Sequence, residues 1–127
     1  MTHYNIKTVT KKVIDSRFCK GKCYQYRIEI ENDGKKARFT YNDSVYNYER
    51  KKELDYDDVL YCLMLDARAY SETEDILDFC MQFGYVNDIK RCREAYKGCE
   101  ENYYKLNSLF TEKELNEIEK QMEEKGY

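Results

Sequence analysis

The side chains of this chain that could do chemistry are one histidine, six cysteines and a group of aspartates. His3, Cys19 and Cys23 could supply three zinc ligands, but the two cysteines form no CxxC pair and the sequence specifies no fourth ligand. A Cys–His or Ser–His catalytic pair would depend on His3, which lies near a chain end, where residues are poorly held. The sequence therefore predicts no catalytic residue and leaves weak metal binding at Cys19 and Cys23 open.

Four aspartates could be imagined as a magnesium site: Asp55, Asp57, Asp58 and Asp66. The first three also stand at the expected start of a helix, where negative charge stabilises the helix dipole, and Asp66 lies two turns later. We expect the helix-end role. The five glycines are too dispersed to form a phosphate-binding loop, so the sequence predicts no cofactor and no enzyme activity.

The expected state of the cysteines depends on the compartment of the protein. No stretch approaches the roughly 20 apolar residues that span a bilayer, and the N-terminal segment lacks the features of a signal peptide. We expect a cytoplasmic protein without membrane contact, in which all six thiols are free. Four of them lie on the apolar stripes of predicted helices, where cysteine behaves as a small hydrophobe: Cys62, Cys80, Cys92 and Cys99.

Charge is unevenly divided along the 127 residues. Residues 1–52 contain 13 Lys or Arg against 6 Asp or Glu, and residues 53–127 contain 9 against 19, so net charges of +7 and −10 give the −3 of the chain. Its 42% hydrophobic residues suffice for one folded domain of this length. We expect a single domain, 1–127, with a basic strand region (1–52) and an acidic helical region (53–127). The two regions could attract each other, stay solvated or bind partners of opposite charge.

Alternation with a period of two predicts strands in the basic region. Residues 4–8 form a first strand that continues to Val13 and Ile14, and residues 24–31 form a second. Asp33-Gly34 tolerates the positive φ of a tight turn, so residues 37–41 should complete an antiparallel hairpin. The polar, tyrosine-rich segment 42–53 is predicted to be a loop.

Apolar residues at three- and four-residue steps predict helices in the acidic region. The first covers 55–70, and a short second helix is capped by Ser71 or Thr73 and stops at Gly84. The third begins after Asn87 or Asp88 and packs its stripe, Tyr96 included, on the sheet. The last begins at Thr111 and ends before Gly126. The sequence thus predicts an α+β fold in which an N-terminal antiparallel three-stranded sheet packs against three to four C-terminal helices.

The chain resembles, over roughly residues 24–110, a family of short proteins encoded by phages and related mobile elements. These residues carry the resemblance: Phe39-Thr40-Tyr41, Ser44, Asp58-Val59-Leu60-Tyr61-Cys62-Leu63, Asp66-Ala67, Phe79-Cys80, Phe83-Gly84-Tyr85, Asp88, Tyr96 and Cys99. Such proteins are similar in layout, and accessory phage proteins of this size include inhibitors of bacterial defence, anti-CRISPR proteins among them. The resemblance implies a non-enzymatic inhibitor in the bacterial host cytoplasm that binds a defence effector protein or complex.

Two sets of residues are candidates for binding a partner. An inhibitor would meet a basic protein surface with large aromatic and acidic side chains. These are Tyr46, Tyr48, Asp55, Asp57, Glu72, Glu74 and Asp75. The alternative role of these acidic residues is helix-end stabilisation.

The alternative function is a small nucleic-acid-binding accessory protein. Its basic N-terminal sheet would bind phosphate while Tyr24 or Tyr26 stacks on a base. The phosphate-binding residues would be Lys11, Lys12, Arg17, Lys20, Lys22, Lys35, Lys36 and Arg38. The net negative charge favours the inhibitor over this alternative, and a structural or assembly role is a third hypothesis.

Overall fold

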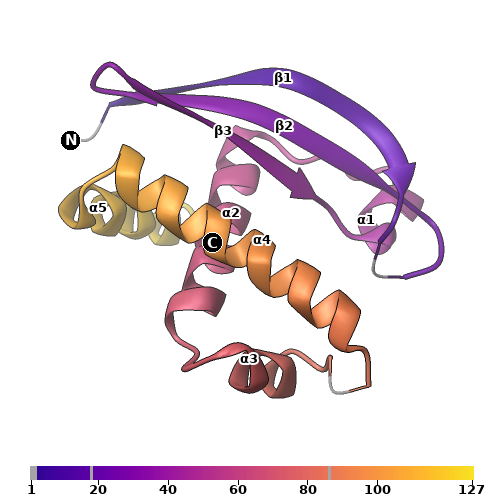
Figure 1. Cartoon of the computed structure of the whole chain (residues 1–127). Helices are drawn as coiled ribbons and strands as arrows, with labels where there is room; N and C mark the ends of the chain where they lie inside the picture. Colours follow the sequence, from indigo (N-terminus) through magenta and orange to yellow (C-terminus); the bar gives the residue numbers. More distant parts are fainter. Residues whose placement is uncertain (1–2, 18, 86) are drawn as a thin grey trace.

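The basic region forms a three-stranded antiparallel sheet, which confirms the predicted fold class. The computed structural model describes residues 3–17, 19–85 and 87–127, and its strands pair in the order β1-β2-β3 (Figure 1). The strands are β1 (Tyr4–Asp15), β2 (Lys22–Asn32) and β3 (Lys35–Asn42). Asp33 (φ 51°) and Gly34 (φ 78°) connect β2 to β3. Two consecutive left-handed residues match the twist of the strands, so the hairpin closes in two residues.

A β-bulge in β1 decides which of its side chains face the helices. The register with β2 shifts between Thr8 and Thr10. The extra residue moves odd-numbered side chains to the face that even-numbered ones occupied before it. Lys11 therefore lies opposite Tyr26, on the inner face, and pairs with Glu53.

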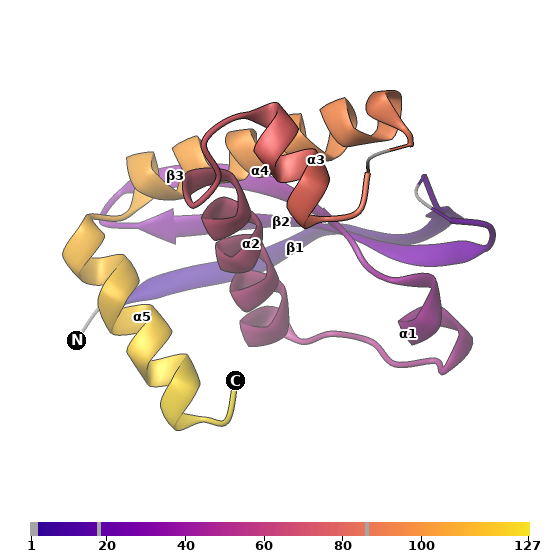
Figure 2. The same cartoon turned by 90° about the horizontal axis from the view of Figure 1, so that it is seen from below.

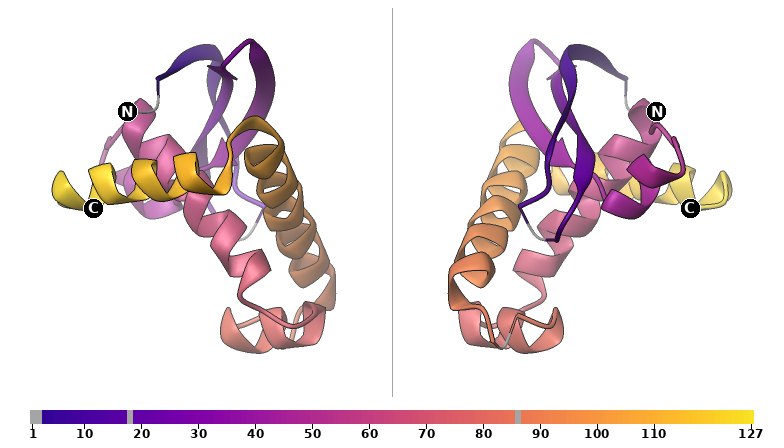
Figure 3. Two further views of the ribbon diagram at one scale, coloured as in Figure 1. Left: turned by 90° about the vertical axis from the view of Figure 1, so that its left-hand side faces the viewer. Right: turned by 90° about the vertical axis from the view of Figure 1, so that its right-hand side faces the viewer.

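The helices of the described residues lie on one side of the sheet (Figures 1 and 3). They are α1 (Val45–Glu49), α2 (Tyr56–Ser71), α3 (Ile76–Gln82), α4 (Ile89–Leu109) and α5 (Glu112–Glu124). Seen from below, α2 and α4 lie between the viewer and the sheet, and α5 lies at one end (Figure 2). The short helix α3 closes the end of the α2–α4 pair that is distant from the sheet (Figure 3).

The main core lies between the inner face of the sheet and the helices α2, α4 and α5. Its central side chains are at most 2% exposed: Ile28, Ile30, Phe39, Val59, Leu60, Leu63, Leu106, Leu109, Ile118 and Met122. All of them except Leu109 come from residues predicted by period two in the strands and by three- and four-residue steps in the helices. Burial of this apolar surface, at about 25 cal/mol per Å², joins the basic and acidic regions in one core.

The stripe of α4 divides between two clusters, and the prediction that it packs on the sheet throughout is wrong. Leu106 lies in the main core, whereas Cys92 and Tyr96 lie in a second cluster with Phe79 of α3. The ring centroids of Tyr96 and Phe79 are 5.3 Å apart. Since the N-terminal half of α4 lies away from the sheet, it meets α3 instead.

The segment 42–53, predicted to be a loop, contains the short helix α1. Ser44 caps it by accepting a hydrogen bond from the Asn47 amide at 3.1 Å. The side chain of Asn47 in turn donates to the buried carboxylate of Asp43. Capping and this buried hydrogen bond together stabilise a helix of only five residues.

Helix α3 begins after Asp75, and the predicted caps Ser71 and Thr73 are wrong. Ser71 is the last residue of α2, and the Thr73 hydroxyl donates at 3.0 Å to carbonyls in the last turn of that helix. Asp75 accepts from the Asp78 amide at 2.9 Å. The caps predicted for the later helices are confirmed, with Asp88 before α4 and a capping box at Thr111 before α5.

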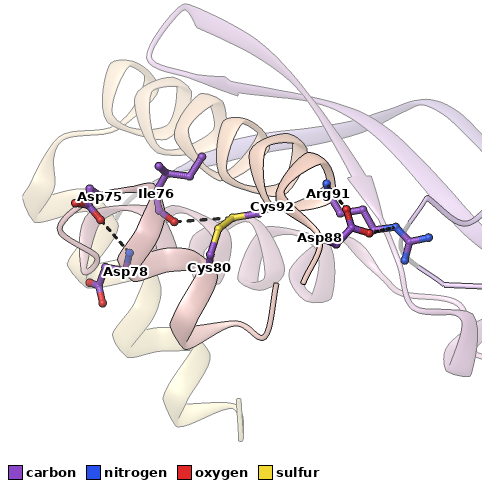
Figure 4. Close-up of a disulfide and its surroundings, with 7 residues drawn as sticks. All are labelled: Asp75, Ile76, Asp78, Cys80, Asp88, Arg91 and Cys92. Carbon is purple, nitrogen blue, oxygen red and sulfur yellow. Dashed lines mark hydrogen bonds and ion pairs between the residues drawn. A yellow bond between two sulfur atoms is a disulfide. The ribbon is translucent and has the colours of Figure 1, made fainter. Parts of the chain in front are cut away.

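Cys80 and Cys92 form a disulfide between α3 and α4, so the prediction of six free thiols is wrong (Figure 4). Their Cα atoms are 5.8 Å apart, within the usual span of a disulfide. Gly84, at φ 79°, ends α3 and lets the chain reverse, which brings two buried cysteines face to face. The remaining cysteines are free: Cys19, Cys23, Cys62 and Cys99.

Candidate functional site

The seven residues predicted for protein binding lie in three separate places. Tyr46 and Tyr48 are on α1, Asp55 and Asp57 are at the start of α2, and Glu72, Glu74 and Asp75 lie beyond its other end. Helix α2 has 16 residues and is therefore about 24 Å long. The structure thus brings Glu72, Glu74 and Asp75 together and separates them from the other four.

Several of these side chains are engaged within the chain. Asp55 caps α2 by accepting from the Asp58 amide at 2.8 Å, and Asp57 pairs with Lys125 at 3.0 Å. The ring of Tyr48 packs on Tyr24, with centroids 5.2 Å apart. The helix-end role therefore accounts for Asp55, as it does for Asp75.

Tyr46 of α1 is exposed to solvent but is partly covered by Arg50. Tyr46 is 63% exposed, and its hydroxyl accepts a hydrogen bond from the Arg50 guanidinium at 2.8 Å. The same guanidinium lies 4.7 Å from the centre of the Tyr46 ring. Arg50 thus covers part of the aromatic surface that was predicted to contact a partner.

The basic residues predicted for nucleic-acid binding are spread along the sheet. Arg17, Lys20 and Lys22 lie near the β1–β2 connection, and Lys35 and Lys36 lie at the β2–β3 turn. Since β2 has 11 residues, these two groups are about 35 Å apart. Lys11, Lys12 and Arg38 are all exposed, and Lys11 pairs with Glu53.

Carboxylates neutralise part of this basic set. Lys22 pairs with Asp15 at 2.6 Å, Lys36 with Glu31 at 3.6 Å, and Arg38 with Glu29 at 3.4 Å. Lys7 also pairs with Glu29, at 3.0 Å. The outer face of the sheet is therefore a mixed-charge surface, on which a phosphate backbone finds cations and carboxylates side by side.

A groove of about 720 Å³, within the usual volume range of ligand sites, lies beside the edge strand β3. It is bounded by the edge strand β3, by α2 and α4, and by the end of α3. Its lining is aromatic, charged and polar: Arg17, Thr40, Tyr41, Asn42, Leu65, Asp66, Ala69, Phe79, Phe83, Tyr85, Glu94, Ala95, Lys97, Gly98, Cys99, Glu101, Asn102 and Lys105. We call this surface the Asp66 groove.

Asp66 is the carboxylate of this groove that is most withdrawn from water. Burial raises its pKa from 3.8 to about 6, although the amide of Asn102, at 3.4 Å, donates to the carboxylate and opposes the rise. Helix α2 places Asp66 about three turns after its N-cap Asp55, next to β3 and α4 in the lining of the groove. Asp66 does not join Asp55, Asp57 and Asp58, so the structure separates the imagined magnesium ligands.

Weak acids surround Asp66. Burial raises the pKa of the Tyr41 hydroxyl, the Cys62 thiol and the Tyr85 hydroxyl, and the charge of Asp66 adds to the rise in each. Burial, with the same charge, raises the pKa of Cys99 to about 12. Both thiols therefore stay protonated near neutral pH, and neither is the thiolate that nucleophilic catalysis needs.

The lining of the groove combines hydrogen-bonding groups with aromatic rings. The described residues contain no group of three or more His, Cys, Asp or Glu side chains that could hold a metal ion, and the possibility raised for Cys19 and Cys23 gains no support. Asn102 and the acids around Asp66 provide hydrogen-bonding groups, and the rings provide apolar contact.

Next to the groove, α3 presents apolar side chains to solvent. Leu77 is 63% and Met81 is 73% exposed, and they lie one turn apart on one side of the helix. Phe83 and Leu65, also exposed, line the groove itself. Asp78 lies in α3, and Glu74 and Asp75 directly precede it. Glu72, at the C-cap of α2, pairs with Arg68 at 3.7 Å and completes a set of four acidic residues. We call Leu77, Met81 and these four acidic residues the α3 surface.

Sequence reasoning missed the groove, because its residues come from five separate segments that only the fold brings together. A signal was present: Tyr41, Cys62, Asp66, Phe79, Phe83, Tyr85 and Cys99 all carry the resemblance to the phage-encoded family, and all line the groove or surround Asp66. Their types are those of core residues, so spacing alone gave no reason to group them.

Comparison of the chain with protein-family models, with curated proteins and with solved structures gave no match. Among the helices of the described residues, none combines the length and the apolar character that a membrane span requires.

Proposed function

We propose that this protein is non-enzymatic and acts by binding another protein, and that its partner is an effector protein or complex of a bacterial defence system. The observation that carries protein binding is the pair of large apolar side chains, Leu77 and Met81, on a helix that a disulfide fixes to α4. Apolar side chains on a rigid element bind with little loss of conformational entropy.

The chemistry of the partner follows from the charge around these side chains. Glu72, Glu74 and Asp75 surround the start of α3, in a region of the chain with a net charge of −10. Such a rim accelerates association with a basic surface and disfavours acidic ones. A basic, partly apolar protein surface, such as the nucleic-acid channel of a defence complex, has the complementary properties.

The assignment to bacterial defence rests on the resemblance to short phage-encoded proteins. Direct nucleic-acid binding is the competing function. The separated, partly neutralised cations of the sheet give it less support than the α3 surface gives to protein binding.

The test is affinity capture with the tagged protein from a bacterial lysate that contains CRISPR or other defence complexes. We expect the wild-type chain to recover a defence component and the Leu77→Ser/Met81→Ser variant to lose it, because that variant removes the exposed apolar contact and leaves the core intact. Tyr46→Ser is the matched control, since it removes an equally exposed side chain from α1.

Three results would contradict the proposal. They are recovery of no defence component, equal recovery by the double variant, and binding of DNA or RNA at modest salt in place of protein. Loss of capture by Tyr46→Ser alone would move the contact from the α3 surface to α1.

A further inference from the structure

Among the described residues, no cation pairs with the carboxylate of Asp66 in its groove. Within these residues, its one hydrogen bond comes from the neutral amide of Asn102. Lys105, which also lines the groove, instead donates to the Arg38 carbonyl at 2.9 Å. A partly buried carboxylate in this state gains most from a cation that enters from outside.

The walls of the groove suit a flat cation. Tyr41 and Tyr85 contribute hydroxyl groups that can accept hydrogen bonds, and the rings of Tyr85 and Phe79 are nearly parallel, at 5°. A guanidinium group binds a carboxylate through two N–H donors and stacks on aromatic rings, whereas an ammonium group does neither as well.

The rim limits what can carry this cation. Glu94 and Glu101 line the groove together with Arg17, Lys97 and Lys105, so its exposed charges are mixed in sign, and Asp66 is its most buried acid. A run of cations would meet the three basic side chains. A single arginine flanked by neutral or acidic residues would bring one cation to Asp66 and no further cations to the three basic side chains.

We propose that the Asp66 groove receives a single arginine side chain of the partner protein, beside the α3 surface. This inference rests on the proposed function and names the chemistry of one contact within it. The groove is large enough for the arginine and part of the backbone that carries it.

The contact depends on pH in a defined direction. The groups that face Asp66 are Tyr41 from β3, Cys62 from α2, Tyr85 from the α3–α4 connection, and Cys99 and Asn102 from α4. Of these, Asp66, with its pKa of about 6, is the one that changes charge between pH 5 and pH 7.5. Since the arginine binds the ionised carboxylate, affinity should fall about tenfold over that range on acidification.

In the test, ethylguanidinium is titrated into the purified chain near pH 7.5, and the amide chemical shifts of the protein report binding. We expect saturable shifts at residues lining the groove, weaker binding of ethylammonium, and about tenfold weaker binding of ethylguanidinium near pH 5. Asp66→Asn keeps the size of the side chain and should abolish the shifts. Glu123→Gln removes one charge from exposed surface and is the matched control.

No saturable shifts in the groove, or equal binding by wild type and Asp66→Asn, would overturn the inference. This outcome is distinct from failure of the proposed function. If a captured partner is lost with Leu77→Ser/Met81→Ser but retained at equal affinity by Asp66→Asn, the protein-binding function stands and the arginine contact is wrong.

Discussion

At the scale of single residues, Asp66 is the group on which the proposed arginine contact depends. Its ionised form is favoured by water, and the groove withholds water from it, so its pKa rises from 3.8 to about 6. Burial of the ionised carboxylate favours binding of an external cation, and it destabilises the folded chain when no cation is bound. A site that is destabilising without its ligand is typical of functional residues.

Asp66→Asn should therefore stabilise the isolated chain near neutral pH. The pKa of Asp66 is higher in the folded chain than in the unfolded chain. The wild-type chain is therefore free of the cost of burying this group below about pH 4, and its free energy of unfolding falls as pH rises through about 6. The difference between 3.8 and about 6 corresponds to at most about 3 kcal/mol. Denaturant unfolding near pH 7.5 should show a higher midpoint for the variant, and the gain should shrink toward pH 4. A variant that is less stable at pH 7.5, or equally shifted at both values, would contradict this account.

At the scale of elements, α3 depends on its disulfide. It has seven residues, too few for a stable isolated helix, and its buried side chains are Phe79 and Cys80. Joining Cys80 to Cys92 closes a short loop and is worth about 2 to 3 kcal/mol in the chain-entropy account. The bond thus holds Leu77 and Met81 in place for binding.

Alkylation after denaturation without reductant should label four cysteines, and labelling after reduction should reach six, as read by intact mass. The reason is that the disulfide protects two thiols. Cys99→Ala is the control, and should lower the unreduced count by one. Six labels without reductant would show that α3 is held by packing alone.

The elements also show what the sequence could and could not predict. Residues 24–31 and the Asp33-Gly34 turn predicted their hairpin, because a period of two and a two-residue positive-φ turn are local signals. The disulfide was missed because each cysteine fits its own helical stripe equally well as a small hydrophobe. Helix α1 was missed because its stability comes from the Ser44 cap and the buried Asp43, not from an apolar stripe.

At the scale of the whole molecule, the basic and acidic regions share a core and keep their charges largely apart. Among the ion pairs of the described residues, Lys11 with Glu53 is the one that joins the two regions. The others lie within the sheet or within the helices. The excess charge of each region therefore faces solvent, where it can act on a partner. The division of charge could be predicted from the sequence, but only the fold shows that most ion pairs lie within each region.

The most direct test of the central claim, binding of a defence protein through the α3 surface, is an interference assay in bacteria that express an active CRISPR system. Plasmid survival is compared for cells with the wild-type chain, with Leu77→Ser/Met81→Ser, and with Tyr46→Ser, at matched protein levels. We predict that the wild type and Tyr46→Ser raise plasmid survival and that the double variant does not, because it alone lacks the exposed apolar contact. Plasmid survival that is unchanged by the wild-type chain, or raised equally by the double variant, would contradict the claim.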